Sequence, residues 1–335
     1  MPANVGAMFY TGDMPWHEEG LALQRPATLD EALKVGELNW EVGEADLMTA
    51  GSIPSPAPTR KAIVRLDRPE GHERRVVGVV HRGFQPIQNR DGAMLFDGVF
   101  GKGEAVYETG GYLGDGEVIW LLARIEKPLT VGRGDVVQPY ALLANSHDGS
   151  IAFTIRLTTV RVVCQNTLAI AMSERGLGQA FRRRHGGSFR EHAEAAREFY
   201  AATLHSLGSV TDQFVSLSKK RCEKAQFEAL LASLLPEPRK PRNAAANRGL
   251  LRAWETKVEN IRRARAKIVE LRESGRGMNL DTAAGTYWGA LNAIIEFVDH
   301  DHGDERSRLS YALLGDGMDL KMRAFAKIGE LAKAA

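Results

Sequence analysis

The hydrophobic period of this chain changes near residue 190. Before that point, branched and apolar residues alternate in short runs separated by glycine-rich turns, and after it they recur every three to four positions. The clearest hairpin has Leu113 and Val118 on either side of a Gly-Asp-Gly turn. Strands and helices do not alternate throughout, as a parallel sheet would need. The pattern predicts an α+β protein, with an antiparallel, hairpin-rich sheet in the N-terminal half and a helical C-terminal half.

The same patterns predict where the elements lie. Strands are expected at 40–42, 61–66, 75–80, 105–109, 117–125, 136–144 and 151–163. Helices are expected at 28–35, 89–100, 189–207, 213–235, 249–273, 280–299 and 318–334, with Thr28 and Glu31 forming a capping box on the first. We therefore expect a β-rich α+β domain over residues 1–188 and a helical region over 189–335 that packs on it. An exposed basic linker is expected near 236–248, where prolines stop a helix.

Charge is distributed unevenly along the chain. The net charge is +2, yet residues 151–280 hold 24 Lys and Arg against 12 Asp and Glu, and the remainder holds 20 against 30. Clustered basic charge is the electrostatic footprint of a polyanion partner. The alternative is a solvated helix face with internal ion pairs, which suits Arg262, Arg263, Arg265 and Lys267.

Several arginines and one lysine are therefore predicted to contact nucleic acid. Alternation along the strand at 151–163 places Arg156 opposite Ile155, and Arg161 opposite Val160 and Val162. We expect these apolar residues and Leu168 to be buried and both arginines to face a polar site. The full set of predicted nucleic-acid contacts is Arg156, Arg161, Arg182, Arg183, Arg184, Lys240 and Arg242.

A polar turn precedes that strand and supplies a second candidate site. Its residues are Asn145, His147 and Asp148, with Asn166 following the strand. His147 and Asp148 form the best acid–base pair in the chain, although adjacent residues on a turn commonly just cap it. Cys164 lies close to Arg161, which favours a thiolate, but a buried structural cysteine is the alternative.

Motifs of known chemistry are missing. The chain has no GxSxG, no HExxH, no phosphate-binding GxxxxGK[ST] loop and no dinucleotide GxGxxG after a strand. His300 and His302 have no third ligand nearby, and on a helix they would point apart. We expect no metal, no cofactor and no catalytic residue, and whether any reaction is catalysed is left open.

The chain is expected to be a cytoplasmic protein. No run approaches the roughly 18 apolar residues of a membrane span, and the N-terminus lacks the pattern of a signal peptide. Its two cysteines, Cys164 and Cys222, lie far apart, which fits a reducing compartment. No membrane partner is expected.

Seven motifs carry a resemblance to a known family. They are MPWH with Gly20, the segment 28–42 ending in NWEV, ETGGYLGDGEVIWLLARI, NSHDGS, VRVVCQNTL, TAAGTYWGALNAIIEFVDH and SRLSYALLGDGMDLKMRA. In that order they resemble the phage/plasmid-like protein family, also called domain of unknown function 932, over essentially the whole chain. Residues 17–20 depart from the family, reading His-Glu-Glu-Gly where it usually has Trp-His-Gly.

The resemblance implies a mobile-element protein without an established reaction. A weaker similarity, at the level of the fold, is to single-strand annealing recombination proteins. It implies single-stranded DNA binding, with annealing or protection of the strand during recombination. A homo-oligomer is expected because the edges of an antiparallel sheet pair with other chains, and head-to-tail contact between the acidic ends and the basic middle closes into a ring if the rotation permits. Two alternatives are a non-catalytic module acting on a host protein, in defence or anti-defence, and an enzyme of unrecognised type.

Overall fold

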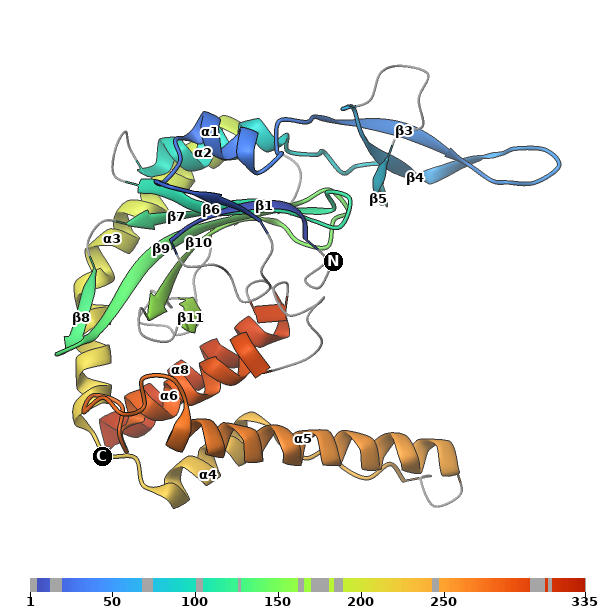
Figure 1. The fold of residues 1–335 in the computed structure, drawn as a ribbon. Helices are drawn as coiled ribbons and strands as arrows, with labels where there is room; N and C mark the ends of the chain where they lie inside the picture. The colour runs from blue at the N-terminus through green and yellow to red at the C-terminus, as the bar shows by residue number, and fades with distance from the viewer. Residues whose placement is uncertain are drawn as a thin grey trace. The chain divides into compact units, whose positions relative to one another are not determined.

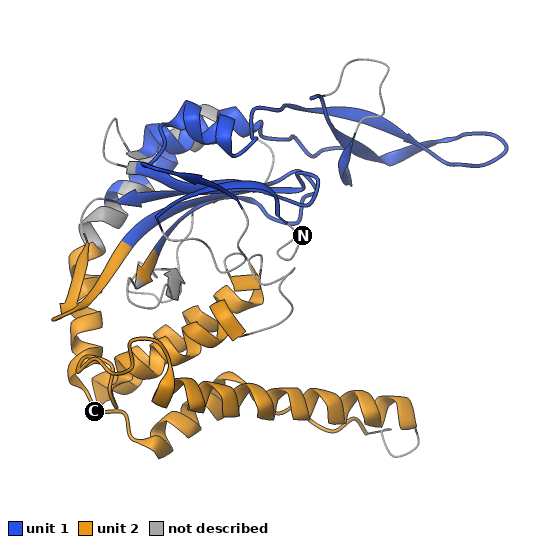
Figure 2. Cartoon of the chain, viewed as in Figure 1, with its two compact units in different colours: residues 1–127, 139–158, 179–205 blue, residues 128–138, 159–178, 206–335 orange. Residues whose placement is uncertain are grey.

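The computed structural model describes residues 5–12, 20–67, 75–100, 105–125, 128–161, 166–169, 181–183, 189–242, 247–301, 311–312 and 315–334 (Figure 1). Two compact units make up the chain (Figure 2). Unit 1 comprises residues 1–127, 139–158 and 179–205, and unit 2 comprises 128–138, 159–178 and 206–335. Strands lie mostly in the N-terminal half and helices dominate the C-terminal half, so the predicted α+β class is confirmed.

The larger sheet has the strand order β11-β10-β9-β7-β6-β1-β2, with β12 paired to β10 and β8 paired to β9. Its strands are β1 Val5–Thr11, β2 Leu21–Leu23, β6 Ala105–Leu113, β7 Val118–Ile125, β8 Leu129–Gly132, β9 Asp135–Ser146, β10 Phe153–Arg161, β11 Asn166–Ala169 and β12 Phe181–Arg183. The predicted hairpin joins β6 to β7, with Leu113 opposite Val118. Gly114 and Gly116 turn the chain at φ values of 61° and 116°, which only glycine adopts readily.

A smaller antiparallel sheet has the order β3-β4-β5, formed by β3 Val42–Met48, β4 Pro56–Arg65 and β5 Val76–His81. One of its faces packs within unit 1, where Ile63 and Val80 are buried. The β5 backbone approaches the polar turn of β9 so closely that a Cβ on Gly78 would lie 2.4 Å from the His147 carbonyl oxygen. A residue with any side chain at position 78 would therefore push the two segments apart.

The strand predictions erred in three ways. The strand expected at 40–42 shares only Val42 with β3, which extends to Met48. The strands β1, β2, β8, β11 and β12 were not predicted, and all but β1 have four or fewer residues, too few for an alternating period. The pairing of β1 with β2 is also parallel, in contrast to the antiparallel sheet expected.

Unit 1 contains two short helices, as predicted. The first, α1, spans Leu29–Val35, and Thr28 and Glu31 form its capping box. The second, α2, spans Asn89–Phe100. The amide of Asn89 donates to the carbonyl oxygens of Leu38 and Trp40, so the start of α2 is tied to the segment that leads into β3.

The boundary between the next two helices lies elsewhere than predicted. One continuous helix, α3 Phe189–Lys219, crosses the expected gap at 208–212, and α4 spans Lys224–Leu234. The Thr211 hydroxyl donates to the Leu207 carbonyl oxygen at 2.9 Å, so this residue bonds within the helix instead of capping a new one. Gly208 faces open space and is accommodated in the helix interior.

Three more helices lie entirely within unit 2: α5 Arg248–Ser274, α6 Tyr287–Glu296 and α8 Asp316–Ala334. The start of α6 is seven residues later than the predicted residue 280, because Thr286 is the N-cap and accepts from the Gly289 amide. All ten residues of α6 are buried, and the helix packs against both α5 and α8. The π-helical turn η1, Phe297–Asp301, continues from its end.

A buried polar stripe runs along α6 and η1. Trp288 donates to Asp135 at 2.9 Å, Glu296 accepts from the Arg276 amide at 3.1 Å, and Asp299 pairs with Lys321 of α8 at 2.7 Å. Lys321 is 0% exposed. Burying charged groups is unfavourable unless they are paired, so these contacts fix the neighbours of α6.

We predict that Lys321→Met lowers the free energy of unfolding by about 3–5 kcal/mol, because it leaves the buried Asp299 carboxylate without its ammonium partner. Urea denaturation measures the change. Lys327→Met, an exposed position on the same helix, is the matched control and should change stability by less than about 0.5 kcal/mol. Equal losses in the two variants would contradict the prediction.

Candidate nucleic-acid interface

The basic side chains of the α4–α5 segment fall into two groups. One group is bonded to partners within unit 2, and the other is exposed without an ion pair among the residues that the structure describes. The distinction decides which charges are available to an outside anion, since a paired cation contributes little field at a distance.

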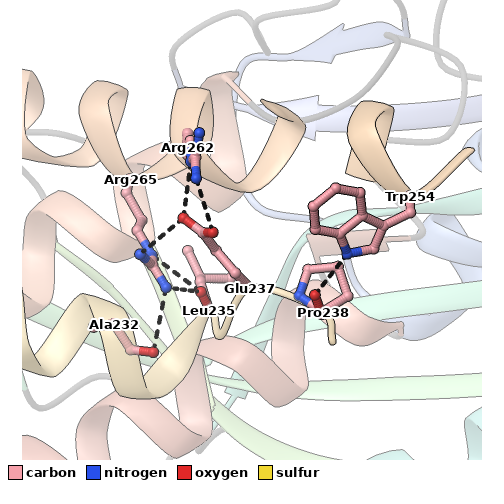
Figure 3. Close-up of polar contacts among 7 residues, drawn as sticks. All are labelled: Ala232, Leu235, Glu237, Pro238, Trp254, Arg262 and Arg265. Carbon is pink, nitrogen blue, oxygen red and sulfur yellow. Dashed lines mark hydrogen bonds and ion pairs between the residues drawn. The ribbon is translucent and has the colours of Figure 1, made fainter. Parts of the chain in front are cut away.

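Arg262 and Arg265 belong to the bonded group, and both contact Glu237 (Figure 3). Arg262 holds the Glu237 carboxylate with two hydrogen bonds, of 2.9 and 3.1 Å. Arg265 lies 3.9 Å from the same carboxylate and donates to the Leu235 carbonyl oxygen, at the C-terminal end of α4, at 2.6 Å. Cations are favourable at a helix C-terminus, where carbonyl groups lack helical partners.

These bonds also set the charge state of Glu237. Its hydrogen bonds with Arg262 hold the pKa of the carboxyl below the ordinary value, and Glu237 in turn raises the pKa of Arg262. A lowered carboxyl pKa keeps the pair ionised above the unfolded-state value, and its contribution to stability is lost only as the pH falls through the lower folded value. The pair is therefore fully charged near neutral pH.

The linker between α4 and α5 lies along α5. The Trp254 indole donates to the Pro238 carbonyl oxygen at 2.8 Å, about two turns before Arg262 on the same helix (Figure 3). The Lys240 ammonium lies 5.4 Å from the centre of the Trp254 ring, within range of a cation–π interaction. Three prolines in the segment 236–241 stiffen the linker further.

Six exposed cations line this linker and the first half of α5. None has an ion pair within the described part of the chain. We call them the basic strip: Arg239, Lys240, Arg242, Arg248, Arg252 and Lys257. The first turn of α5 has no acidic residue, and the helix N-terminus adds partial positive charge there. Glu255 is the one exposed carboxylate between Arg248 and Lys257, so this segment carries a net positive charge. Arg248 and Arg252 are one turn apart on the same face of α5, and Lys257 lies on another face of the helix.

The predicted nucleic-acid residues differ in their exposure to solvent. Lys240 and Arg242 are exposed and belong to the basic strip. Arg182 is exposed on β12, where it lies opposite Thr154 of β10. Arg156 is only 8% exposed, because both faces of β10 are covered from Phe153 to Thr159.

The side-chain environments of the other predicted residues are not described. Arg161 lies in β10, Arg183 in β12, and Asn166 and Leu168 in β11, and only the backbone of these four residues is described. Arg184 and Cys164 lie outside the described residues, as does Val162. Ile155 is buried as predicted, whereas Val160 is only half-buried near the end of β10, which corrects the expectation that it is buried.

The polar turn Asn145–Ser150 holds its candidate residues in structural bonds. The Asn89 amide nitrogen is committed to two backbone carbonyls, so its oxygen is the acceptor that faces Nε2 of His147 at 2.9 Å. His147 therefore carries a proton on Nε2, and its ring, 0% exposed, packs edge-on against Trp40. Asn145 donates to the Ile87 carbonyl oxygen, and Asp148 accepts from the Ser150 amide at 2.8 Å.

No group of three metal-binding side chains occurs in the parts of the chain that the structure describes. Likewise, none of the described helices has the length and apolarity that crossing a bilayer requires. The candidate surface is the basic strip, because its six cations are exposed. Four of its members, Arg239, Arg248, Arg252 and Lys257, were missed by the sequence reasoning. Arg248 and Lys257 could have been found, because no Asp or Glu lies three or four positions from either.

We predict that Trp254→Phe loosens the linker. The substitution removes one hydrogen bond, to Pro238, of about 1 kcal/mol while keeping an aromatic ring, so the detached state becomes up to about fivefold more populated. Limited trypsin digestion should cut after Arg239 and Arg242 correspondingly faster, as followed by mass spectrometry. Thr256→Ala, an exposed change two residues away, is the control, and equal digestion of both variants would contradict the prediction.

Comparison with known proteins identifies one family. The model described as "Domain of unknown function (DUF932)" matches residues 76–314. The match begins at the first residue of β5 and is narrower than the resemblance, which extended over essentially the whole chain. No curated protein and no solved structure matches the chain. Because the family model covers most of the sequence, the chain belongs to the domain of unknown function 932 family.

Proposed function

We propose that this protein binds single-stranded DNA and that the basic strip is its principal contact surface. The observation that supports this proposal is the set of six exposed cations along one linker and one helix, none of which has an ion pair with another described residue. Arginine suits phosphate because its planar guanidinium donates two parallel hydrogen bonds, and lysine contributes a point charge. Such a surface binds the backbone of a nucleic acid without reading its sequence.

The expectation of a single strand comes from the resemblance to annealing proteins and not from the strip. The strip adds one relevant feature, since Trp254 lies beside Lys240 among its cations. An aromatic ring among basic side chains is a common arrangement in single-strand binding. Annealing or protection of the strand during recombination, in a phage- or plasmid-type element, is the role we propose.

A second basic segment supports the same function. Arg182 is exposed on β12, and Arg183 and Arg184 follow it in the sequence. We propose that these three arginines and Arg161 make further phosphate contacts. Arg156 is left out of the proposed surface, because a buried guanidinium does not reach a phosphate outside the protein.

We predict that replacing Arg248, Arg252 and Lys257 together with Gln weakens binding to a single-stranded oligonucleotide and flattens its salt dependence. Each lost phosphate contact removes about 0.7 from the slope of log affinity against log salt, so three contacts remove about 2. Fluorescence anisotropy at several salt concentrations measures both quantities. A duplex of the same sequence is titrated in parallel, and tighter binding of the duplex would contradict the single-strand preference.

The matched control replaces Lys224, Lys327 and Lys333, which are also exposed without an ion pair in the described structure, so the net charge falls by the same amount. The control should bind with nearly the parent's slope. An equal effect of both triple variants would show that only total charge matters. Failure of the parent protein to bind at low salt would end the proposal. Replacing Arg182, Arg183 and Arg184 with Ala tests the second segment by the same slope.

The two alternatives receive less support. An enzyme using His147 and Asp148 would need both groups accessible, but His147 is buried and Asp148 caps its own turn. A module acting on a host protein would need a recognisable partner surface. The exposed apolar residues of the small sheet, described next, can be explained by contact between copies of this chain.

Self-association through the small sheet is a further proposal. Five exposed large apolar residues lie on this sheet or in the segments that adjoin its strands: Met48, Ile53, Leu66, Val76 and Val79. Val76 and Val79 belong to β5, an edge strand without a charged residue, and such edges pair with other strands unless blocked. We predict that Val79→Lys lowers the native mass measured by light scattering at micromolar concentration. A parent protein that is already a strict monomer would contradict this prediction.

A further inference from the structure

The Glu237 cluster has the form of an occupied anion site. Two guanidinium groups from adjacent turns of α5 face one carboxylate, which Arg262 holds by both oxygens. A planar guanidinium matches carboxylate and phosphate oxygens with the same two-pronged geometry. Arg262 can therefore donate the same two hydrogen bonds to a phosphate once the Glu237 carboxylate has moved away.

Access to this site is open. The Arg262 side chain is 62% exposed and the Glu237 side chain 36% exposed, so no buried group has to move. Exposed ion pairs contribute little to stability, so an incoming phosphate can compete with one at little loss. The site is also continuous with the basic strip, because Glu237 is followed by Pro238, which Trp254 holds, and then by Arg239.

Arg265 makes the site more than a single exposed arginine. Its guanidinium is held in place by hydrogen bonds to the Leu235 carbonyl oxygen at 2.6 and 3.0 Å, so its position does not depend on Glu237. When the carboxylate moves out, one fixed cation and one adjustable cation are left facing the vacated position. The contact of Arg265 with the C-terminal end of α4 thus holds one of the two guanidinium groups in position before a phosphate binds.

We propose that Arg262 and Arg265 form a second phosphate-binding site, adjoining the basic strip, which the Glu237 carboxylate occupies until a phosphate displaces it. This inference rests on the proposed nucleic-acid function for the identity of the ligand, a phosphate group of the DNA backbone. It assigns a ligand-binding function to two arginines whose other contacts are within unit 2. It also predicts that Glu237 lowers DNA affinity by more than its charge alone would do.

The test compares the removal of two exposed carboxylates, one that is hydrogen-bonded to Arg262 and one that has no ion pair among the described residues. Glu255→Gln removes an exposed carboxylate with no bond to the strip among the described residues, and it should tighten oligonucleotide binding by about twofold through net charge. Glu237→Gln removes the same charge and also releases Arg262. It should tighten binding by about fivefold or more and steepen the salt slope by about 0.7, the value of one added phosphate contact.

Arg262→Gln, made in both backgrounds, isolates the site. In the parent it should weaken binding by about twofold or less, because Glu237 already occupies the guanidinium. In Glu237→Gln it should weaken binding by about fivefold and return the salt slope to the parent value. Equal effects of Arg262→Gln in the two backgrounds would overturn the inference, even if the parent binds DNA.

The remaining outcomes separate this inference from the proposed function. Binding by Glu237→Gln alone, lost on adding Arg262→Gln, would support the second site and overturn the basic strip as a sufficient surface. No binding by either the parent or Glu237→Gln would overturn both proposals. Competition by inorganic phosphate against the oligonucleotide in the Glu237→Gln variant distinguishes a site for any phosphate from one that needs the DNA backbone. Circular dichroism confirms that each exposed substitution leaves the fold unchanged.

Discussion

The burial of α6 on every side governs the architecture of unit 2. A helix without a solvent face has to satisfy its polar side chains inside the protein, and α6 and η1 carry several of them in one stripe. Three positions of the stripe are satisfied by partners from different elements. The partners are Asp135 of β9, the Arg276 amide in the turn after α5, and Lys321 of α8. The C-terminal end of α5 is thereby fixed close to the core, while its N-terminal half carries exposed cations.

The charge excess of the middle of the chain is divided between two uses. Some arginines complete the structure, as Arg265 does at the end of α4. Others are displayed, such as Arg248 and Arg252 on the exposed side of α5. Arg262 is exposed but bonded to one exposed carboxylate, that of Glu237, so its charge becomes available to a ligand only when that carboxylate moves away. Net charge alone cannot distinguish these cases, since each arginine adds the same unit of charge to the sum.

Short-range signals allowed much of the fold to be predicted from the sequence. The capping box of Thr28 and Glu31 and the Gly-Asp-Gly hairpin depend only on neighbouring residues, and both were confirmed. The start of α6 was wrong because Asp281, Thr282 and Thr286 are all good N-caps locally. The burial of α6 depends on distant partners such as Lys321, which the local pattern does not reveal. Arg156 illustrates the same limit, because alternation predicts opposite faces for Ile155 and Arg156 but not that both faces of β10 are covered.

The sequence segments of the two units are interleaved. Unit 1 draws on three stretches of the chain, the last ending at residue 205, and unit 2 begins as early as residue 128. A ribosome therefore releases β8 and the first part of β9 well before the helices of unit 2 exist, and unit 1 is incomplete until the first half of α3 has emerged. A fragment that ends at any single position between 128 and 205 lacks part of both units. Folding of this protein is thus tied to synthesis of nearly the whole polypeptide, and gene truncations in that interval should give products that proteases clear rather than a working half.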